Sequence, residues 1–167
     1  MVGDEEFVPF KAKSLDLIFS NLSLHWVNDL PGTLIQIRHT LKEDGLFLAA
    51  MLGENTLIEL RNAFYLAEQE REGGLSPHVS PFAGVADMGN LLTRAGFALP
   101  TVDTESFTIR YKDPWVLFSD LRAMGESNAT LKRRLSTPPS TLMAAAAAYQ
   151  AMYGAADGSI PATFQVR

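Results

Sequence analysis

Apolar residues along this chain alternate between short continuous runs and longer stretches with helical spacing. The runs at 15–20 and 46–51 are short and bounded by polar residues, which is typical of strands that are covered on both faces. Between them, Asn28 or Asp29 can cap a helix, and the Asp-Gly pair at 44–45 predicts its end. A strand, a helix and a second strand joined by short connections predict parallel pairing with a right-handed crossover.

Helical spacing dominates the rest of the chain, and three further segments have the pattern of extended structure. Helices are predicted at 54–72, at 84–95, from Pro114 to about Met124, and from Pro138 onward. Extended segments are predicted at 97–102, 106–111 and 160–167. Because neither a linker nor an internal repeat separates these elements, we predict one α/β domain over residues 1–167.

Two of these helices have a clear apolar face. In the helix at 54–72 this face consists of Leu57, Leu60, Phe64 and Ala67. The glutamates of that helix fall mostly on its polar side, where we expect ordinary surface ion pairs: Glu59, Glu68, Glu70 and Glu72. In the last helix the packed side is predicted to consist of Leu142, Ala145, Tyr149 and Met152.

Composition narrows the class of protein. A hydrophobic fraction of 47% and a charged fraction of 20% are those of a soluble domain with a real core. The net charge of -5 argues against contact with a phosphate backbone, so no nucleic-acid partner is expected. The lack of cysteine excludes disulfides, thiolate metal sites and a cysteine nucleophile. No apolar run has the length of a membrane span, so at most peripheral membrane association is expected, and the acidic start is not a targeting peptide.

Polar and aromatic residues follow the first predicted strand directly. Ligands bind at the carboxyl ends of strands in open α/β sheets, so Ser20 and Asn21 are candidate ligand contacts, although simple turn chemistry also explains them. His25 and Trp26 are either an aromatic pair that caps the next helix or a wall over a reacting group, with His25 as acid or base. The structural interpretation of His25 is favoured, because no carboxylate lies at a useful spacing.

The acidic start offers a second candidate contact. Asp4, Glu5 and Glu6 precede the apolar segment 7–10, which is explained either by an acidic tail or by a purine site. In the second interpretation the carboxylate of Asp4 accepts a hydrogen bond from an exocyclic amine of the purine. A metal site is not predicted, because the three histidines do not have ligand spacing: His25, His39 and His78.

Taken together, these segments resemble a known fold family. The resemblance rests on Asp4-Glu5-Glu6-Phe7-Val8-Pro9-Phe10, on Asp16-Leu17-Ile18-Phe19, on Leu24-His25-Trp26 and on Leu41-Lys42-Glu43-Asp44-Gly45. These motifs are similar to those of a class I S-adenosylmethionine-dependent methyltransferase from its fourth strand onward. Glu43-Asp44 stands where Pro-Gly is usual, which affects a turn and not the chemistry. The implied fold is a partial Rossmann-like class I methyltransferase fold, with strands four to seven, the last one or two antiparallel, and helices on both faces.

The second half of the chain resembles a narrower family. The motifs are Ala67-Glu68-Gln69-Glu70-Arg71-Glu72-Gly73-Gly74, Ser76-Pro77-His78-Val79-Ser80-Pro81-Phe82, Met124-Gly125-Glu126-Ser127-Asn128 and Asp157-Gly158-Ser159-Ile160-Pro161-Ala162-Thr163. They are similar to those of the mitochondrial complex I assembly factor 5 family. The resemblance implies a role in complex I assembly in the mitochondrial matrix, with a core subunit of complex I as the protein substrate. It also implies hydroxylation of an arginine of that subunit.

The resemblance assigns roles to residues at matching positions. It implies that Asp4 meets the adenine amine of S-adenosylmethionine and that Glu5 supplies an adjacent backbone contact. Asn21 and Leu22 then lie against the methionine moiety. His25 and Trp26 form a lid beside the reactive end of the cofactor.

Two family features that contact the cofactor would lie before Met1: the glycine-rich loop after strand one and the acidic ribose-binding residue after strand two. The family's last strand also continues beyond Arg167. We therefore expect tight S-adenosylmethionine binding by a full-length parent protein rather than by this chain alone, and an exposed sheet edge in this chain. Two alternatives stay open. One is a conventional methyltransferase acting on a small acid or a carrier-bound acyl group, and the other is a non-catalytic truncated form.

Overall fold

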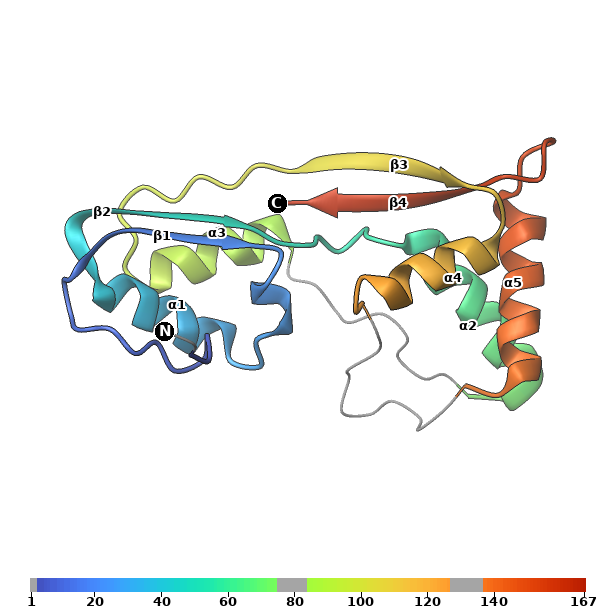
Figure 1. The fold of residues 1–167 in the computed structure, drawn as a ribbon, viewed down its shortest axis with the longest axis horizontal. Helices are drawn as coiled ribbons and strands as arrows, with labels where there is room; N and C mark the ends of the chain where they lie inside the picture. The colour runs from blue at the N-terminus through green and yellow to red at the C-terminus, as the bar shows by residue number, and fades with distance from the viewer. Residues whose placement is uncertain (1–2, 75–83, 127–136) are drawn as a thin grey trace. The chain divides into compact units, whose positions relative to one another are not determined.

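The computed structural model describes residues 3–74, 84–126 and 137–167, and Figure 1 shows the arrangement of their helices and strands. The predictions for the loop at 75–82 and for the motif at 127–128 lie outside the described residues. Contacts divide the chain into two compact units. The first unit comprises residues 1–54, 82–105 and 165–167, and the second comprises residues 55–81 and 106–164. The single domain predicted over residues 1–167 stays a prediction.

The first unit contains the predicted strand–helix–strand arrangement. Strand β1 (Leu15–Asn21) is followed by helix α1 (Leu30–Thr40) and strand β2 (Leu41–Ala50), and the two strands pair in parallel. Leu17 lies opposite Leu46 in the register of this pair. Parallel pairing through a helical crossover is confirmed.

Helix α1 begins where predicted but ends earlier. The carboxylate of Asp29 caps it by accepting a hydrogen bond from the backbone N–H of Gly32 at 3.0 Å. The helix stops at Thr40 and not at 44–45, because Leu41 is extended and already pairs with Leu15 of β1. The prediction of the helix end was therefore wrong. An Asp-Gly pair indicates a turn, but the pairing of Leu41 with Leu15 sets the end of this helix.

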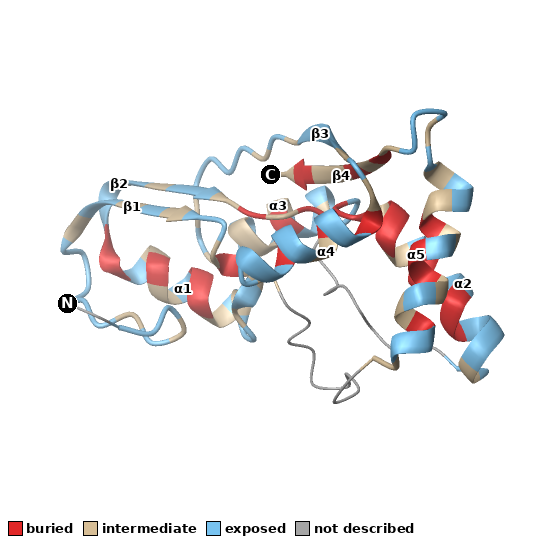
Figure 2. Cartoon of the chain, turned by 45° about the vertical axis from the view of Figure 1, so that its right-hand side comes forward, coloured by how far each residue is buried: buried red, intermediate tan, exposed pale blue. Residues whose placement is uncertain are grey.

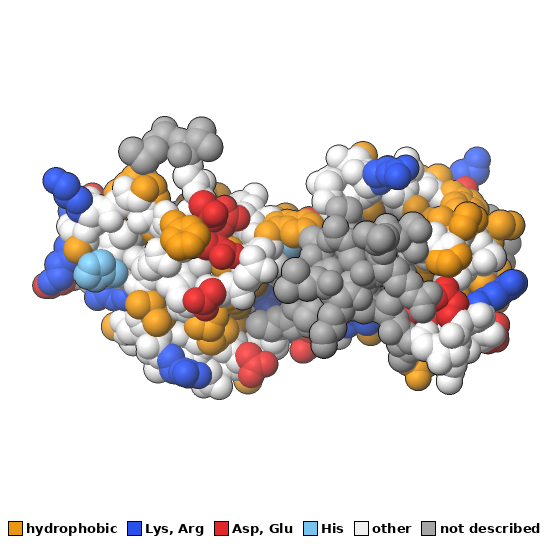
Figure 3. All heavy atoms as spheres, turned by 90° about the horizontal axis from the view of Figure 1, so that it is seen from below, with side chains coloured by type: hydrophobic (Ala, Val, Ile, Leu, Met, Phe, Trp, Pro, Cys, Tyr) orange, Lys and Arg blue, Asp and Glu red, His pale blue; other side chains and the backbone are white. Residues whose placement is uncertain are grey.

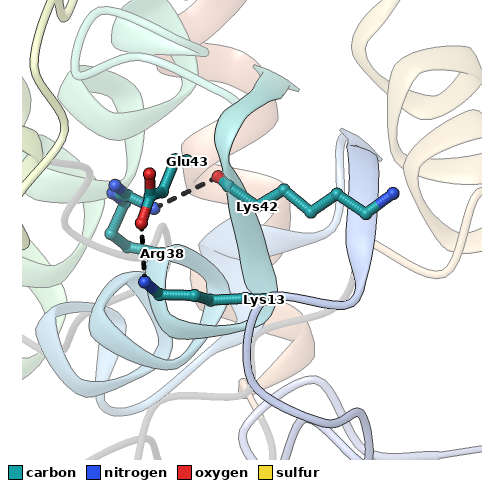
Figure 4. A network of polar contacts seen from close by, with 4 residues as sticks. All are labelled: Lys13, Arg38, Lys42 and Glu43. Carbon is teal, nitrogen blue, oxygen red and sulfur yellow. Dashed lines mark hydrogen bonds and ion pairs between the residues drawn. The ribbon is translucent and has the colours of Figure 1, made fainter.

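Charged side chains connect the segment before β1 with the start of β2 (Figure 4). The Nζ atom of Lys13 lies 2.7 Å from Oε1 of Glu43, and Arg38 donates a hydrogen bond to the backbone oxygen of Lys42. The side chain of Lys42 points away from this pair and binds both carboxylate oxygens of Asp16, at 2.7 and 2.8 Å. These ion pairs are exposed and individually weak. Together they favour the register in which the two segments lie side by side.

The two faces of the β1–β2 pair differ. Helices α1 and α3 (Val85–Arg94) lie on one side of the strands in Figure 1, where the apolar core of the unit consists of Leu24, Ile37, Leu41, Met51 and Met88. The other face has four large apolar side chains with exposed fractions of about one half or more: Leu17 54%, Phe19 66%, Leu46 53% and Leu48 47%. Figure 2 accordingly colours much of both strands as exposed. The prediction of strands covered on both faces was wrong for the described residues, because no described element of this unit covers the second face.

The last residues of the chain run antiparallel beside the segment that follows β2. Met51 and Arg167 exchange backbone hydrogen bonds of 2.9 Å in both directions, and Leu52 forms an antiparallel bridge with Val166. The two segments approach closely at position 53, where a Cβ atom would lie 2.5 Å from Oε1 of Gln165 and would require that side chain to shift. The predicted antiparallel direction of the last strand is confirmed.

The described residues of the second unit form three helices and most of two strands. They are α2 (Ile58–Glu72), β3 (Glu105–Tyr111), α4 (Pro114–Ala123), α5 (Pro139–Tyr153) and β4 (Ile160–Val166). Strands β3 and β4 pair, and their arrows point in opposite directions in Figure 1. The predicted apolar face of the first of these helices is confirmed, since all four of its residues are buried: Leu57, Leu60, Phe64 and Ala67. No helix among the described residues combines the length and the apolar character needed to cross a bilayer.

Several expectations for the second unit were wrong in instructive ways. Glu59 and Glu68 are buried rather than surface-exposed. The carboxylate of Glu59 accepts hydrogen bonds from the N–H and the hydroxyl of Thr163, at 3.1 and 2.5 Å, which offsets the cost of its burial. Helix α2 starts at Ile58 rather than at position 54, because Leu57 has a left-handed backbone conformation and donates its N–H to Thr163.

The predicted packed side of α5 is confirmed in part. Ala145 and Tyr149 are buried and Leu142 is partly buried against the same core, whereas Met152 is exposed. Thr141 is buried as well, four residues before Ala145. The segment at 97–102, predicted to be extended, forms no strand. In α5 the buried residues 141, 145 and 149 follow a four-residue spacing, which differs from the mixed spacing that was predicted.

Candidate functional site

The N-terminal segment at 3–10 is held against α1 by side chains. The amide of Gln36 donates from Nε2 to the backbone oxygen of Glu6 at 2.8 Å, and its Oε1 accepts from the N–H of Val8 at 3.1 Å. The carboxylate of Glu6 accepts hydrogen bonds from the backbone and the side chain of Asn28, at 2.6 and 2.9 Å. A segment without regular secondary structure is thereby fixed in place.

Asp4 and Glu5 lie at an exposed turn within this segment. The backbone oxygen of Asp4 accepts a hydrogen bond from the N–H of Phe7 at 3.1 Å, and its Oδ1 accepts one from the N–H of Glu6 at 2.9 Å. The turn orients the carboxylate of Asp4 through one of its oxygens. Among the described residues, the second oxygen has no hydrogen-bond donor, so it is available to a ligand.

The carboxyl end of β1 contains a strained residue. Asn21 ends the strand, and Leu22 has a φ of 50°, a left-handed conformation that non-glycine residues rarely adopt. The N–H of Leu22 donates to the backbone oxygen of Ala50 at 2.8 Å, which helps to hold this conformation. Strain of this kind costs about 1–3 kcal/mol and clusters at functional sites.

These two segments line one cavity of about 360 Å³, to which Asp4, Glu5 and Asn21 all contribute. Its apolar part includes Val8, Pro9, Phe10, Ile18, Phe19 and Leu24, and its polar part also includes Ser20 and Ser23. A carboxylate and an amide above apolar side chains suit a flat, partly apolar ligand that carries hydrogen-bond donors. The structure therefore brings together three of the six predicted cofactor residues.

The other three predicted residues do not line this cavity. Leu22 is exposed, and His25 and Trp26 lie in a short 3₁₀ turn, Leu24–Trp26, with their ring centroids 5.3 Å apart and their planes tilted by 41°. This geometry fits the interpretation of His25 and Trp26 as an aromatic pair before α1. Their role as a lid over the cofactor stays a prediction.

Sequence reasoning missed Gln36, Glu6 and Ser23 at this site. Gln36 is one amide on a helix, and nothing local marks it as a clamp on a segment that lies some thirty residues away in the chain, as its contacts with Glu6 and Val8 show. The alternation of acidic and apolar residues in the segment was the only available signal. This signal indicated the segment at 3–10, but it did not indicate that Gln36 holds the segment in place.

The charge distribution around the site is mixed. Figure 3 views the molecule from the side on which α1 lies in the first unit, and acidic and hydrophobic side chains lie beside one another there while the basic ones are scattered. Within residues 3–74, 84–126 and 137–167, no three His, Cys, Asp or Glu side chains are grouped so that they could hold a metal ion. The described part of the site thus offers carboxylate, amide, hydroxyl and apolar contacts.

Known proteins share both the sequence and the fold of this chain. Residues 1–49 match the family described as "Methyltransferase domain". The chain is 52% identical over 166 residues to the protein named "Arginine-hydroxylase NDUFAF5, mitochondrial" of Danio rerio, a match that covers 99% of this chain and 52% of that protein. The chain is therefore similar in sequence to proteins that are named NDUFAF5 arginine hydroxylases.

The chain spans about half the length of the curated NDUFAF5 relatives that it matches. A more distant relative is "Malonyl-[acyl-carrier protein] O-methyltransferase" of Xylella fastidiosa, with 39% identity over 165 residues, 98% of this chain and 54% of that protein. The resemblance to the complex I assembly factor 5 family is therefore confirmed at the level of sequence.

A solved structure shows the same fold. The YcgJ protein from Bacillus subtilis has a TM-score of 0.59 and 15% identity, over 98% of this chain and 66% of that protein. Together with the methyltransferase domain match, this similarity confirms the class I methyltransferase fold. The family's sequences and the fold therefore agree with the expectation drawn from the motifs.

Proposed function

We propose that this chain is part of an arginine hydroxylase of mitochondrial complex I assembly, related to NDUFAF5, which acts on a core subunit of the complex in the mitochondrial matrix. The observation that supports this proposal is 52% identity to the Danio rerio arginine hydroxylase over 99% of the chain. Identity to the malonyl-carrier-protein methyltransferase is lower, at 39%. The relatives' name and their mitochondrial designation favour this activity and this location.

S-adenosylmethionine is the cofactor that the fold suggests, and the cavity fits part of it. Asp4 would accept a hydrogen bond from the adenine amine, with Glu5 beside it, and Asn21 would bind the methionine end. The apolar floor beneath them suits the adenine ring. When bound, the cofactor supplies an activated methyl group on a sulfonium. The residues of this chain supply orientation and exclude water from one side of the cofactor.

Substitutions in the parent protein test this assignment. Asp4→Ala and Asn21→Ala are each expected to weaken S-adenosylmethionine binding about tenfold, which corresponds to about 1.4 kcal/mol for a lost polar contact. Asp157→Ala, a change of an exposed carboxylate in the second unit, is the matched control and should leave the affinity unchanged. Isothermal titration calorimetry measures all three variants. Unchanged affinity in both site variants would remove Asp4 and Asn21 from the site.

The chain by itself is expected to bind the cofactor weakly. The chain spans about half the length of the curated relatives that it matches, so contacts that the rest of such a protein would supply are not available to the cofactor. Calorimetry with S-adenosylmethionine on the 167-residue chain tests this expectation. Micromolar affinity would contradict it, and it would also count against the alternative of a non-catalytic truncated form.

The reaction itself is tested on the substrate. Cells that lack the parent protein are compared with cells in which it is restored, and peptides of the complex I core subunits are analysed by mass spectrometry. We expect the gain of one oxygen on an arginine that depends on the protein. A gain of a methyl group on that subunit instead would exclude the hydroxylase. We assign the oxygen chemistry to none of the described residues of this chain.

A conventional methyltransferase is the second candidate. Two observations favour it: the methyltransferase domain match at residues 1–49 and the 39% identity to the malonyl-carrier-protein enzyme. Its substrate would be a small acid or a carrier-bound acyl group. Transfer of a labelled methyl group from S-adenosylmethionine to malonyl carrier protein by the parent protein would support this candidate, and its failure would leave the hydroxylase.

A further inference from the structure

A single side chain of α1 holds the N-terminal segment of the cavity on both sides of Phe7. Gln36 donates from Nε2 to the backbone oxygen of Glu6 at 2.8 Å, and its Oε1 accepts from the N–H of Val8 at 3.1 Å. Both hydrogen bonds are partly buried, and water competes less with bonds that are shielded from it. The segment runs beside α1 in the first unit (Figure 1), and Gln36 fixes its distance from the helix.

Glu6 connects this hold to the carboxylate of Asp4. The N–H of Glu6 donates to Oδ1 of Asp4 at 2.9 Å, and the N–H of Phe7 donates to the backbone oxygen of Asp4 at 3.1 Å. The carboxylate of Glu6 accepts hydrogen bonds from the backbone and the side chain of Asn28, at 2.6 and 2.9 Å. The N–H, the backbone oxygen and the carboxylate of Glu6 are therefore all engaged, the oxygen by Gln36. The position of Glu6 thereby sets the direction of the Asp4 carboxylate.

The residues that hold the segment lie outside the cavity, whereas the residue that they orient lines it. Asp4 lines the cavity of about 360 Å³, and so does Ile37, the neighbour of Gln36 on α1. Gln36 and Asn28 do not line it. A hydrogen bond weakens steeply when its donor and acceptor are misaligned, so these two residues can act on a ligand through the direction of Asp4. Helix α1 thus supports both the apolar floor of the cavity and its acidic wall.

We infer that Gln36 is a positioning residue that gives this site its selectivity for a purine with an exocyclic amine. One oxygen of the Asp4 carboxylate is fixed by Glu6, and the other can accept a hydrogen bond from the amine. A site built around such a bond rejects a ligand that lacks the donor, but only while the carboxylate keeps its direction. The inference rests on the proposed cofactor site, and it assigns a role to a residue that acts through Asp4.

The experiment measures selectivity between two ligands rather than one affinity. Isothermal titration calorimetry on the parent protein compares S-adenosylhomocysteine with its 6-deamino analogue, in which hydrogen replaces the amine. We expect the unchanged protein to prefer S-adenosylhomocysteine about tenfold, and Asp4→Ala to remove this preference. Gln36→Met, which keeps the length of the side chain without its amide, should reduce the preference to about threefold or less. A general loss of stability would weaken the binding of both ligands equally and would leave their ratio unchanged.

Further variants separate positioning from other roles of Gln36. In the Asp4→Ala background, Gln36→Met should leave the ratio where Asp4→Ala has set it, because the two residues act through one contact. Gln36→Glu keeps the acceptor for the N–H of Val8 and loses the donor to Glu6, so it should also reduce the preference. Gln69→Met is the matched control: it makes the same change at an exposed position of α2, in the second unit, and should leave the ratio unchanged.

Three results would overturn the inference, and each identifies the assignment that fails. If Gln36→Met and Gln36→Glu keep the preference while Asp4→Ala removes it, Gln36 does not position Asp4, and the cofactor site stands. If Asp4→Ala keeps the preference as well, the assignment of Asp4 to the adenine amine fails, and the role of Gln36 fails with it. If Gln36→Met changes the ratio in the Asp4→Ala background, Gln36 acts on the ligand by a route other than Asp4.

Discussion

The two units of this chain differ in how they bury their apolar residues. In the second unit, α2 and α5 pack against each other and against β4, and Ala63, Ala145, Tyr149, Ile160 and Ala162 have no exposed surface. In the first unit, the core lies only on the side of α1 and α3, and the other face of the strands is exposed. The second unit thus encloses its core between helices and a strand, although Phe107 and Ile109 of β3 are 42% and 45% exposed. The first unit buries apolar residues on one side of its strands only.

The polar residues differ in the same way. In the second unit, two buried polar side chains have partners inside the unit: Glu59 with Thr163, and Thr141 with Glu72. In the first unit, Gln36 and Glu6 use their hydrogen bonds to hold an exposed segment in place. Polar contacts stabilise a core in one unit and shape a site in the other.

The largest effect is expected from Tyr149→Ala in the second unit. This side chain is fully buried, its hydroxyl donates to the backbone oxygen of Pro161 at 2.7 Å, and its ring packs edge-on against Tyr153. Its removal should lower the free energy of unfolding by about 3–5 kcal/mol, as for large aromatic residues in cores. Urea unfolding measures the change. Tyr65→Ala is the matched control, since Tyr65 is half exposed in the same unit and should cost less than about 0.5 kcal/mol. Equal losses would show that Tyr149 is not held in a tightly packed core.

The next largest effect is expected from Gln36→Ala in the first unit. The change removes two hydrogen bonds and leaves the backbone groups of Glu6 and Val8 without their partners, at a cost of about 1–3 kcal/mol. Hydrogen exchange should become faster at residues 3–10 and stay unchanged in the second unit. His39→Ala, on the exposed side of the same helix, is the control and should change neither. Protection that persists at 3–10 would mean that Gln36 does not hold this segment.

Tyr149→Phe is expected to have a smaller effect on the free energy of unfolding at neutral pH and a larger effect at high pH. The lost hydrogen bond should cost about 1 kcal/mol at pH 7. Burial, followed by the nearby charge of Glu59, raises the pKa of Tyr149 far above its ordinary value of 10.0. The folded state therefore keeps the proton where the unfolded state loses it, and stability falls as the pH rises above about 10. Alkaline unfolding should become less steep in the Phe variant, and an unchanged pH profile would contradict this account.

The smallest effects are expected from one exposed carboxylate in each unit. The hydrogen bond and the charge of Lys13 lower the pKa of Glu43, and hydrogen bonds from the hydroxyl and N–H of Ser159 lower the pKa of Asp157. Each contribution to stability is present above the ordinary pKa of the group and is lost as the pH falls through the lowered one. Glu43→Gln and Asp157→Asn should each make acid unfolding slightly less steep.

The effects of these two carboxylates on acid unfolding are expected to respond differently to salt. High salt should remove the effect of Glu43→Gln, because the partner of Glu43 is a charged lysine. It should spare the effect of Asp157→Asn, because the first partner of Asp157 is a neutral hydroxyl. Equal salt sensitivity in acid unfolding curves would contradict this distinction.

Local signals predicted most helices and strands. Asp29 caps α1, Pro114 opens α4, Gly73 ends α2 with a positive φ and Gly125 follows α4 in the same way. These signals act within a few residues, so the sequence contains them in full. The errors fall where a distant segment intervenes, as Thr163 does at the start of α2 and β1 does at the end of α1.

The candidate site was predictable in part. Asp4, Glu5 and Asn21 were proposed from a family resemblance, and the structure places all three around one cavity. Gln36 was not predictable, because an amide on a helix is compatible with solvent as well as with a backbone partner. Glu59 was misplaced for the same reason: its burial depends on a hydrogen-bond partner more than a hundred residues away in the chain.

The amino-acid sequence by itself indicated the similarity to the complex I assembly factor 5 family, the order of most helices and strands, and the parallel direction of the first two strands. Spacing, caps and motifs act over short distances, so each segment of the sequence contains its own signals in full. Only the tertiary structure decided which faces are covered, which glutamates are buried and what holds the N-terminal segment at the cavity. Burial and hydrogen-bond pairing depend on which segments approach from elsewhere in the chain. On one face of β1 and β2, large apolar side chains stay exposed because no described residues cover them: Leu17, Phe19, Leu46 and Leu48.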